Sequence, residues 1–213
     1  MSGAANLDQA VHHYRNLAPR YDHYTRRINR IRLRTIEALG LRAGDCVLDA
    51  GCGTGWCVPW LLEAVGERGR VIAFDPSDDM LHVARERIGL DGRVEFLRAT
   101  AQGVQLPAAV DAILFSYTHD VMRSAEALEN LLGQAKRGAR VAATSTKLYA
   151  KWLVPANWYL RATHRQYITN FEGLEAPWSL LARYLDDFAV RTGPFTQHYI
   201  ATGRVRAGKD QLA

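Results

Sequence analysis

Residues 47–55 have the sequence Val-Leu-Asp-Ala-Gly-Cys-Gly-Thr-Gly, in which glycine occupies every second position after a short apolar run. The apolar run predicts a buried strand, and residues 56–66 predict the helix that follows it. Glycine lets the backbone turn sharply and approach a ligand that a Cβ would exclude. A helix N-terminus directs unpaired N–H groups at such a ligand. The segment therefore predicts a nucleotide-type cofactor site near the start of an α/β sheet.

The spacing of the glycines distinguishes two kinds of adenosine cofactor. A dinucleotide fingerprint is G-x-G-x-x-G/A, whose third small residue lets the helix pack closely on the strand. Counted from Gly51, that position is Trp56, which opposes close packing. The order G-x-G-x-G at Gly51, Gly53 and Gly55, with the preceding Val-Leu-Asp, resembles motif I of the class I S-adenosylmethionine-dependent methyltransferases. A nicotinamide-dependent oxidoreductase is the alternative.

The resemblance implies roles for residues of the first two strands. By this resemblance, Asp49 is expected to approach the ammonium group of the cofactor. The three glycines are expected to line its methionine part. A second predicted strand, residues 70–75, ends in Asp75, whose carboxylate can accept both ribose hydroxyls of either kind of cofactor. Pro76 follows it among the expected cofactor contacts. Ser77 is the expected N-cap of a helix over residues 77–88, and Met80 is expected against adenine.

Later strands complete the expected cofactor site. Relatives often have an aspartate at the position of Thr100, which follows the strand predicted at residues 94–98. Thr100, the backbone of Ala101, or Gln102 is expected to replace that contact with the adenine amino group. Ser116 follows the strand predicted at residues 110–115, which in the family ends beside the transferred methyl group.

The candidate base is His119, in the segment after that strand, because imidazole titrates near neutral pH. The alternative is that His119 caps a helix or shapes the pocket. Tyr117 could hydrogen-bond the substrate or pack on the cofactor. His164 and His198 are weaker candidates, since lone histidines are more often structural. Methyltransferases of nucleic-acid bases usually carry an Asn/Asp-Pro-Pro-aromatic motif here, and its absence predicts that nucleic acid is not the substrate.

The N-terminal residues 14–22 have the pattern Y-x-x-x-A-x-x-Y-D. This pattern is similar to the entry helix of small-molecule methyltransferases near the quinone C-methyltransferases and the bacterial phospholipid N-methyltransferases. By that resemblance, Tyr14 and Tyr21 close over the cofactor.

The chain is expected to be one α/β domain of 213 residues with a Rossmann-like, seven-stranded, mostly parallel sheet and helices on both faces. The resemblance implies the strand order 3-2-1-4-5-7-6, with the last strand antiparallel. The predicted parts are N-terminal lid helices (1–40), a cofactor-binding core (45–146), a substrate-covering insertion (147–187) and the final strands (188–203). Within them, a helix is expected over residues 124–136 and ends before Gly138. The final two strands are expected at 188–191 and 195–201.

The composition further limits the classes of protein to which the chain can belong. The chain is 48% hydrophobic and 23% charged, which are globular values, and no apolar run reaches the length of a membrane span. The three cysteines, Cys46, Cys52 and Cys57, are expected to be reduced thiols, which together with the absence of a signal pattern predicts a cytoplasmic protein. The net charge is +5, with arginines concentrated in the N-terminal region. In residues 26–39, Arg27, Arg30 and Arg34 share one helical face, roughly opposite Ile28, Ile31 and Leu39.

Three hypotheses follow. The first is methyl transfer from S-adenosylmethionine to an O or N acceptor on a small aromatic or hydrophobic metabolite. The second is a phospholipid or quinone methyltransferase at a membrane surface, where the basic amphipathic helix would lie on anionic lipid. The third is a non-catalytic cofactor-binding partner subunit. The sequence shows no metal-ligand cluster, so metal independence is expected.

Overall fold

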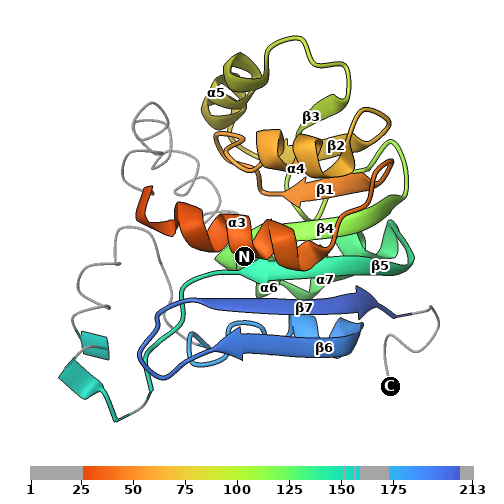
Figure 1. Ribbon diagram of the computed structural model, residues 1–213. Helices are drawn as coiled ribbons and strands as arrows, with labels where there is room; N and C mark the ends of the chain where they lie inside the picture. The colour runs from red at the N-terminus through yellow and green to blue at the C-terminus, as the bar shows by residue number, and fades with distance from the viewer. Residues whose placement is uncertain (1–25, 151, 156, 159–172, 207–213) are drawn as a thin grey trace.

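The computed structural model describes residues 26–150, 152–155, 157–158 and 173–206. Tyr14, Tyr21, His164 and the first predicted N-terminal helix lie outside this part of the chain. Seven strands form one sheet in the order β3-β2-β1-β4-β5-β7-β6, which confirms the predicted order (Figure 1). The strands are β1 (Cys46–Ala50), β2 (Arg70–Asp75), β3 (Val94–Arg98), β4 (Val110–Ser116), β5 (Ala135–Thr144), β6 (Leu185–Thr192) and β7 (Tyr199–Val205).

Helices cover both faces of this sheet. One face carries α3 (Asn29–Leu39), which continues from the 3-10 turn η2 (Arg26–Ile28), together with α4 (Val58–Val65) and α5 (Asp78–Ile88). The other face carries α6 (His119–Met122), α7 (Ala125–Gly133) and the 3-10 turn η3 (Leu181–Tyr184). Figure 1 shows α3 crossing in front of the central strands while α6 and α7 lie behind them. Each face therefore has its own hydrophobic core, as a doubly covered parallel sheet requires.

The central strand β1 sets the position of the site. It pairs in parallel with β2 on one side and with β4 on the other. Residues Val47 to Ala50 are buried, as expected for a strand covered on both faces. Because the parallel strands share one direction, the segments after Ala50, Asp75 and Ser116 meet at one edge of the sheet. Ligands in open α/β sheets bind at this edge.

The last two strands lie partly outside the predicted ranges. β7 is antiparallel to both β5 and β6, which confirms the predicted orientation of the last strand. It begins at Tyr199 rather than Phe195, because residues 193–198 form the connection between the two strands. β6 begins at Leu185, directly after η3, and pairs Leu185 with Val205. The sequence indicated that both strands exist, whereas the residues at which they begin and end depend on pairing with the neighbouring strand.

The helix predicted over residues 124–136 ends at Gly133, and β5 already begins at Ala135. Ser124 caps α7 by accepting a hydrogen bond from the backbone N–H of Ala127 at 3.2 Å. Gly138 is therefore not a helix stop. It lies inside β5 with φ +70°, where the register between β4 and β5 shifts. A glycine with positive φ at an irregular pair is typical of a β-bulge.

Helix α3 uses its apolar side for the core. Ile36 and Leu39 are buried in the cluster beneath α3 and α4, and Ile28 and Ile31 are only partly exposed. The arginines at positions 27, 30 and 34 are exposed, as the sequence predicted. Leu39 of the predicted apolar face therefore packs against the sheet and is not available to a membrane, whereas contact of the basic face with anionic lipid stays a prediction.

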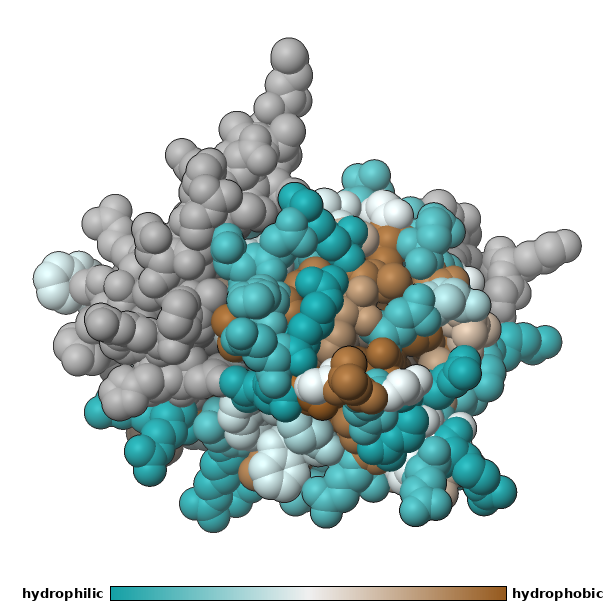
Figure 2. Space-filling model, turned by 90° about the horizontal axis from the view of Figure 1, so that it is seen from above, coloured by the Kyte–Doolittle hydropathy of each residue, from teal (hydrophilic) through white to brown (hydrophobic). Residues whose placement is uncertain are grey.

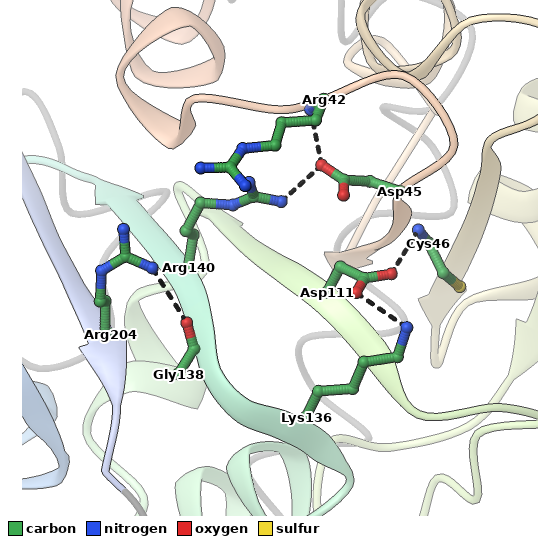
Figure 3. A network of polar contacts seen from close by, with 8 residues as sticks. All are labelled: Arg42, Asp45, Cys46, Asp111, Lys136, Gly138, Arg140 and Arg204. Carbon is green, nitrogen blue, oxygen red and sulfur yellow. Dashed lines mark hydrogen bonds and ion pairs between the residues drawn. The ribbon is translucent and has the colours of Figure 1, made fainter.

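A polar network joins the amino ends of the strands (Figure 3). Asp45 accepts a hydrogen bond from the backbone N–H of Arg42 at 2.6 Å and forms an ion pair with Arg140 of β5. Asp111 of β4 accepts from the backbone N–H of Cys46 at 3.0 Å and from Lys136 Nζ at 2.8 Å. These contacts link β1, β4 and β5 on the side of the sheet opposite to the cofactor edge.

The β3 edge of the sheet is protected by charge. Glu95 and Arg98 are exposed on this short edge strand, and Arg98 pairs with Asp78 of α5 at 2.5 Å. Figure 2 looks onto this side of the molecule and shows hydrophobic surface bordered by hydrophilic residues. Charged side chains on an edge strand oppose pairing with another chain.

Among the helices that the structure describes, none has the length and apolar character needed to cross a membrane.

Gly55 should be intolerant of any side chain. It has φ +68°, and an added Cβ would lie 2.9 Å from the Cβ of Ala84 and 3.2 Å from its Cα. We expect Gly55→Ala to lower the free energy of unfolding by about 2–4 kcal/mol, from backbone strain plus overlap with α5. Gly40→Ala is the matched control, since Gly40 has φ +62° with no atom within 4 Å of the added Cβ. Equal losses in the two variants, measured by urea unfolding, would contradict close packing of α5 as the cause.

Asp111→Asn should remove an acid-sensitive part of the stability. Partial burial raises the pKa of Asp111, but hydrogen bonds from Cys46 N–H and Lys136 outweigh it and lower the pKa below its ordinary value. The stabilisation is therefore present above about pH 4, the unfolded value, and is lost as pH falls toward the folded pKa. We expect a loss of about 1 kcal/mol at pH 7 that vanishes near pH 2. Glu63→Gln, at an exposed α4 position, is the control.

Candidate functional site

A cavity of about 230 Å³ lies at the carboxyl ends of β1, β2 and β4. It brings together most of the residues singled out from the sequence: Asp49, Gly51, Gly53, Asp75, Pro76, Met80, Thr100, Ala101, Ser116, Tyr117 and His119. Other residues of its lining were not predicted, above all Arg32, Phe74 and Trp56. Gly55 is not among the lining residues, and Tyr14 and Tyr21 lie outside the described part of the chain.

The glycine loop has three left-handed residues, and the space next to each of them differs. Gly51 has φ +71°, and a Cβ there would lie 2.6 Å from Cγ2 of Thr118. Gly53 has φ +54° and no atom within 4 Å of an added Cβ, so its backbone faces open space. Gly55 instead admits α5, as described above. Gly51 and Gly53 therefore line the cavity, whereas Gly55 serves the packing of α5.

Asp75 joins the glycine loop to the start of α5. Its two carboxylate oxygens accept hydrogen bonds at 2.9 Å from the backbone N–H groups of Gly53 and Ser77. Burial raises the pKa of Asp75 to about 6, and the two N–H groups oppose that rise. Ser77 caps α5 as expected, accepting from the N–H of Met80 at 3.4 Å. Each oxygen of Asp75 keeps a lone pair that can accept a hydroxyl.

Asp49 is a buried carboxylate with an orphaned oxygen. Its side chain is 1% exposed, and within the described residues Oδ2 has no hydrogen-bond partner. Burial raises the pKa of Asp49 to about 7, Arg32 lowers it, and Asp75 raises it further. A buried acceptor without a donor costs about 1–3 kcal/mol, so a native protein usually supplies one. A cationic donor group of a ligand would satisfy this oxygen, and the cavity offers room beside it.

Arg32 is the functional candidate that the sequence analysis missed. It comes from α3, is 5% exposed, and lines the cavity. Its guanidinium carbon lies 5.4 Å from the ring centroid of Trp56 and 5.7 Å from that of Tyr117, which are cation–π distances. A signal was present, because Arg32 continues the buried helical spacing of Ile36 and Leu39. It was counted instead with the surface basic residues.

The residues expected near adenine differ in whether their polar groups already make hydrogen bonds within the protein. The carbonyl of Ala101 accepts a hydrogen bond from Asn130 Nδ2 at 2.9 Å, and Gln102 Nε2 donates to Ser124 at 3.4 Å. The hydroxyl of Thr100 makes no hydrogen bond to any described residue, so it is the group best placed to replace the usual aspartate. Phe74 and Met80 supply apolar surface to the same cavity.

Two predicted residues in the segment after β4, Tyr117 and His119, make different contacts. Tyr117 has a left-handed backbone with φ +61°, which is unusual for a bulky residue and is typical of functional sites. Its N–H donates to Thr144 O at 2.8 Å, and its hydroxyl lies 2.9 Å from His198 Nδ1. His119 Nε2 lies 3.5 Å from Arg123 Nη1 and must act as the acceptor there, since arginine only donates.

His198 thus joins the site from the connection before β7, 81 residues away from Tyr117 in the chain. On sequence alone it ranks below His119, because lone histidines are more often structural and nothing in the sequence indicates that this one contacts Tyr117 of the cavity lining. The Tyr117–His198 hydrogen bond links the rim of the cofactor cavity to the β6–β7 hairpin.

Thiol and metal chemistry find no support in the described residues. Burial raises the pKa of Cys57 to about 12 and that of Cys52 well above its ordinary value, so neither is a ready nucleophile. Within the described ranges, no group of three His, Cys, Asp or Glu side chains could hold a metal ion. Metal independence stays a prediction.

Comparison with known proteins agrees with this geometry. Residues 47–140 match the methyltransferase domain family. The ubiquinone/menaquinone biosynthesis C-methyltransferase UbiE of Marinomonas sp. (strain MWYL1) is 31% identical over 159 residues, which are 72% of this chain and 60% of that protein. UbiE of Salmonella arizonae is 33% identical over 144 residues, covering 63% of this chain and 57% of that protein. The chain therefore spans about three fifths of the length of these relatives.

Solved structures show the same fold. The N-methyltransferase NodS from Bradyrhizobium japonicum WM9 aligns with a TM-score of 0.62 at 16% identity, covering 84% of this chain and 97% of that one. Its complex with S-adenosyl-L-homocysteine aligns with a TM-score of 0.60 at 16% identity, with coverage of 84% and 90%.

Residues 47–140 therefore match a methyltransferase domain, and the sheet order and the glycine loop are those of the class I S-adenosylmethionine-dependent methyltransferases. Within that family its sequence lies near the quinone C-methyltransferases. S-adenosylmethionine is the cofactor of the family, and the orphaned Asp49 oxygen, the open backbone at Gly53 and the Asp75 carboxylate fit its amino, methionine and ribose groups.

Asp49→Asn should separate stability from cofactor affinity. Because the folded pKa of Asp49 is about 7, the unfolded chain ionises first, and wild-type stability falls as pH rises from about 4 to 7. Asparagine does not ionise, so the variant should gain stability relative to the wild type between pH 4 and pH 8. Its affinity for S-adenosylmethionine should fall by about tenfold or more, since a charged hydrogen bond is lost. Denaturation and calorimetric titration at both pH values measure the two effects.

Glu126→Gln, at an exposed α7 position, provides the control and should change neither quantity. A pH-independent stability difference between Asp49→Asn and the wild type would contradict a carboxylate that is hard to ionise in the folded chain.

Proposed function

We propose that the chain transfers a methyl group from S-adenosylmethionine to an oxygen or nitrogen of a small aromatic or hydrophobic metabolite. The observation that carries this proposal is the orphaned Asp49 carboxylate beside the open backbone of Gly53. Together they offer a negative partner and a close backbone approach for an amino-acid-type ligand. A pyrophosphate-bearing dinucleotide would meet a buried carboxylate at that place instead.

Each predicted cofactor residue then has a role. Asp49 accepts from the ammonium group, and Gly51 and Gly53 border the methionine part. Asp75 accepts the ribose hydroxyls while its bonds to Gly53 and Ser77 hold it in place. Further contacts come from the residues nearer the adenine and the methyl group: Pro76, Met80, Thr100, Ala101 and Ser116. Tyr14 and Tyr21 are proposed as lid residues on the resemblance of the N-terminal pattern alone.

Bound S-adenosylmethionine supplies an activated methyl group on its sulfonium. The chain must align the acceptor in line with that group and exclude water. Trp56, Tyr117 and the Arg32 guanidinium form the side of the cavity where an aromatic acceptor could stack. The predicted lid (1–40) and substrate-covering insertion (147–187) are proposed to cover this side only in part, because α3 and η3 within them pack on the faces of the sheet and β6 already begins at Leu185.

We assign proton acceptance to Tyr117 linked to His198, ahead of His119. Tyr117 can take a proton from a phenol or alcohol at its oxygen while its own proton passes to His198 Nδ1, 2.9 Å away, when that nitrogen is unprotonated. His119 Nε2 already accepts from Arg123, which leaves it less suited to this role. His119 is proposed instead to shape the pocket.

A second candidate is methylation of a ring carbon of a quinone-type phenol. The relatives named above are C-methyltransferases of ubiquinone and menaquinone biosynthesis, which favours this acceptor. Removing the phenolic proton makes both the oxygen and the neighbouring ring carbons nucleophilic, so the same residues would serve. Nucleic acid is not proposed as substrate. A non-catalytic partner subunit is disfavoured by the intact residues from Asp49 to Asp75.

Calorimetric titration with S-adenosylmethionine, S-adenosylhomocysteine and NADH tests the cofactor assignment. We expect micromolar binding of the first two, weakened at least about tenfold by Asp75→Ala, because ribose hydroxyls would lose their acceptor. Glu67→Ala, at an exposed position before β2, should bind like the wild type. Binding of NADH alone would overturn the proposal. A positive result leads to mass spectrometry of a mixture of phenols, amines and hydroquinones, where absence of any methylated product would favour the partner-subunit hypothesis.

Tyr117→Phe should affect phenols more than amines. Loss of the hydroxyl should lower kcat on a phenol acceptor by on the order of 10- to 100-fold, whereas an already neutral amine needs little help. His198→Gln should give a smaller loss and shift the acid limb of the pH–rate profile. A uniform loss on both acceptor classes would show that Tyr117 acts through packing only.

A further inference from the structure

A second hollow, which we call the basic groove, lies between α3 and the ends of β6 and β7, with a volume of about 770 Å³. Four arginines line it: Arg27, Arg30 and Arg34 from the N-terminal helix region, and Arg191 from β6. All four are exposed, and none forms an ion pair within the described part of the chain. Glu37 is the acidic residue of the lining. The groove therefore concentrates positive charge that the fold itself does not use.

Exposed apolar side chains adjoin this groove. Trp152, Val154, Trp158 and Phe195, which we call the aromatic flank, are 65%, 65%, 75% and 72% exposed. Phe195 is next in sequence to Thr196, which lines the groove. Large exposed apolar side chains in a group usually mark a binding surface, because scattered single ones are the normal condition.

Two contacts bring the flank together from separate segments. The rings of Trp152 and Phe195 meet edge to face with their centroids 5.5 Å apart. The N–H of Ala150 donates to the carbonyl of Pro194 at 3.2 Å, which ties the segment after β5 to the β6–β7 connection. Figure 1 shows this segment on the same side of the molecule as the start of α3 and the carboxyl ends of the parallel strands. The flank is thus built at the cofactor edge of the sheet.

The combination has the chemistry of a lipid surface. Arginine binds phosphate through a planar fork of donors, and a cluster of basic side chains is attracted to anionic headgroups. Tryptophan and phenylalanine beside basic residues are typical of segments that sit at the boundary between headgroups and acyl chains. The groove supplies the first property and the flank the second, and the β6–β7 connection joins them, because Phe195 of the flank is next in sequence to Thr196 of the groove.

The groove also meets the cofactor cavity. His198 lines the groove, and its Nδ1 is hydrogen-bonded to the hydroxyl of Tyr117, which lines the cavity. A molecule that entered from a bilayer at this edge would therefore meet His198 in the groove and Tyr117 in the cavity, which are hydrogen-bonded to each other.

We propose that the basic groove and the aromatic flank together dock the chain on an anionic lipid bilayer, with the groove arginines binding headgroup phosphates. This mode differs from an amphipathic helix lying in the membrane, since the apolar side of α3 is buried in the core. Docking does not depend on methyl transfer, but delivery of a hydrophobic acceptor to the cavity rests on the proposed function.

Flotation of the full chain with vesicles tests the docking. Vesicles of phosphatidylglycerol and phosphatidylcholine should bind the protein at low salt, whereas high salt or phosphatidylcholine alone should release it. The double variant Arg30→Glu/Arg34→Glu should weaken binding by about tenfold or more. The double variant Trp152→Ala/Phe195→Ala should also weaken vesicle binding. The remaining binding should stay sensitive to salt. Arg137→Glu, an exposed charge at the amino end of β5, is the matched control and should bind like the wild type.

Several results would overturn the proposal. These are absence of binding to anionic vesicles, an equal loss in Arg137→Glu, or calorimetric binding of inorganic phosphate in the groove without vesicle binding. A dimer by light scattering that Trp152→Ala/Phe195→Ala dissociates, without vesicle binding, would assign the flank to a second copy of the chain. Titration of every variant with S-adenosylmethionine checks that the fold is intact, and it separates a failure of docking from a failure of the proposed function.

Discussion

The carboxylate of Asp75 is the point on which the cofactor edge depends. One oxygen holds the backbone of Gly53 and the other holds that of Ser77, so a single side chain fixes both the glycine loop and the start of α5. Gly55 then allows α5 to pack against the loop. Because the same carboxylate faces the cavity, the group that orders the loop is also the group expected to bind ribose.

Buried charge distinguishes this site from the rest of the core. Asp49 lies near the end of the central strand with an oxygen that has no hydrogen-bond partner among the described residues, and the charge of Arg32 on α3 lowers its pKa. Proteins retain such groups at functional sites, where a ligand completes what the fold leaves open. The site is accordingly held by α3 as well as by the strand–loop–helix unit that the sequence made evident.

The sheet and most of the cavity lining were predictable because both follow from local patterns. Alternating glycines, apolar runs and a terminal aspartate specify strand, loop and helix within a few residues of each other. Gly138 and the start of β7 were misplaced, since a bulge and a strand end depend on the neighbouring strand. Arg32 and His198 were undervalued for a similar reason. Their importance arises from packing between α3, the β6–β7 hairpin and the cavity, and no short stretch of sequence contains those contacts.

The position of β7 has a consequence for the order in which parts of the chain fold. Strands β1 to β5 follow one another along the chain, but β7, which directly follows the Tyr117 partner His198, inserts last, between β5 and β6. Contacts that span so many residues form late, because the entropy of closing the intervening loop must be overcome first. During synthesis, the strands that border the cavity can therefore pair before the contact between Tyr117 and His198 forms. The order of the strands thus separates formation of the cavity from formation of this contact in time.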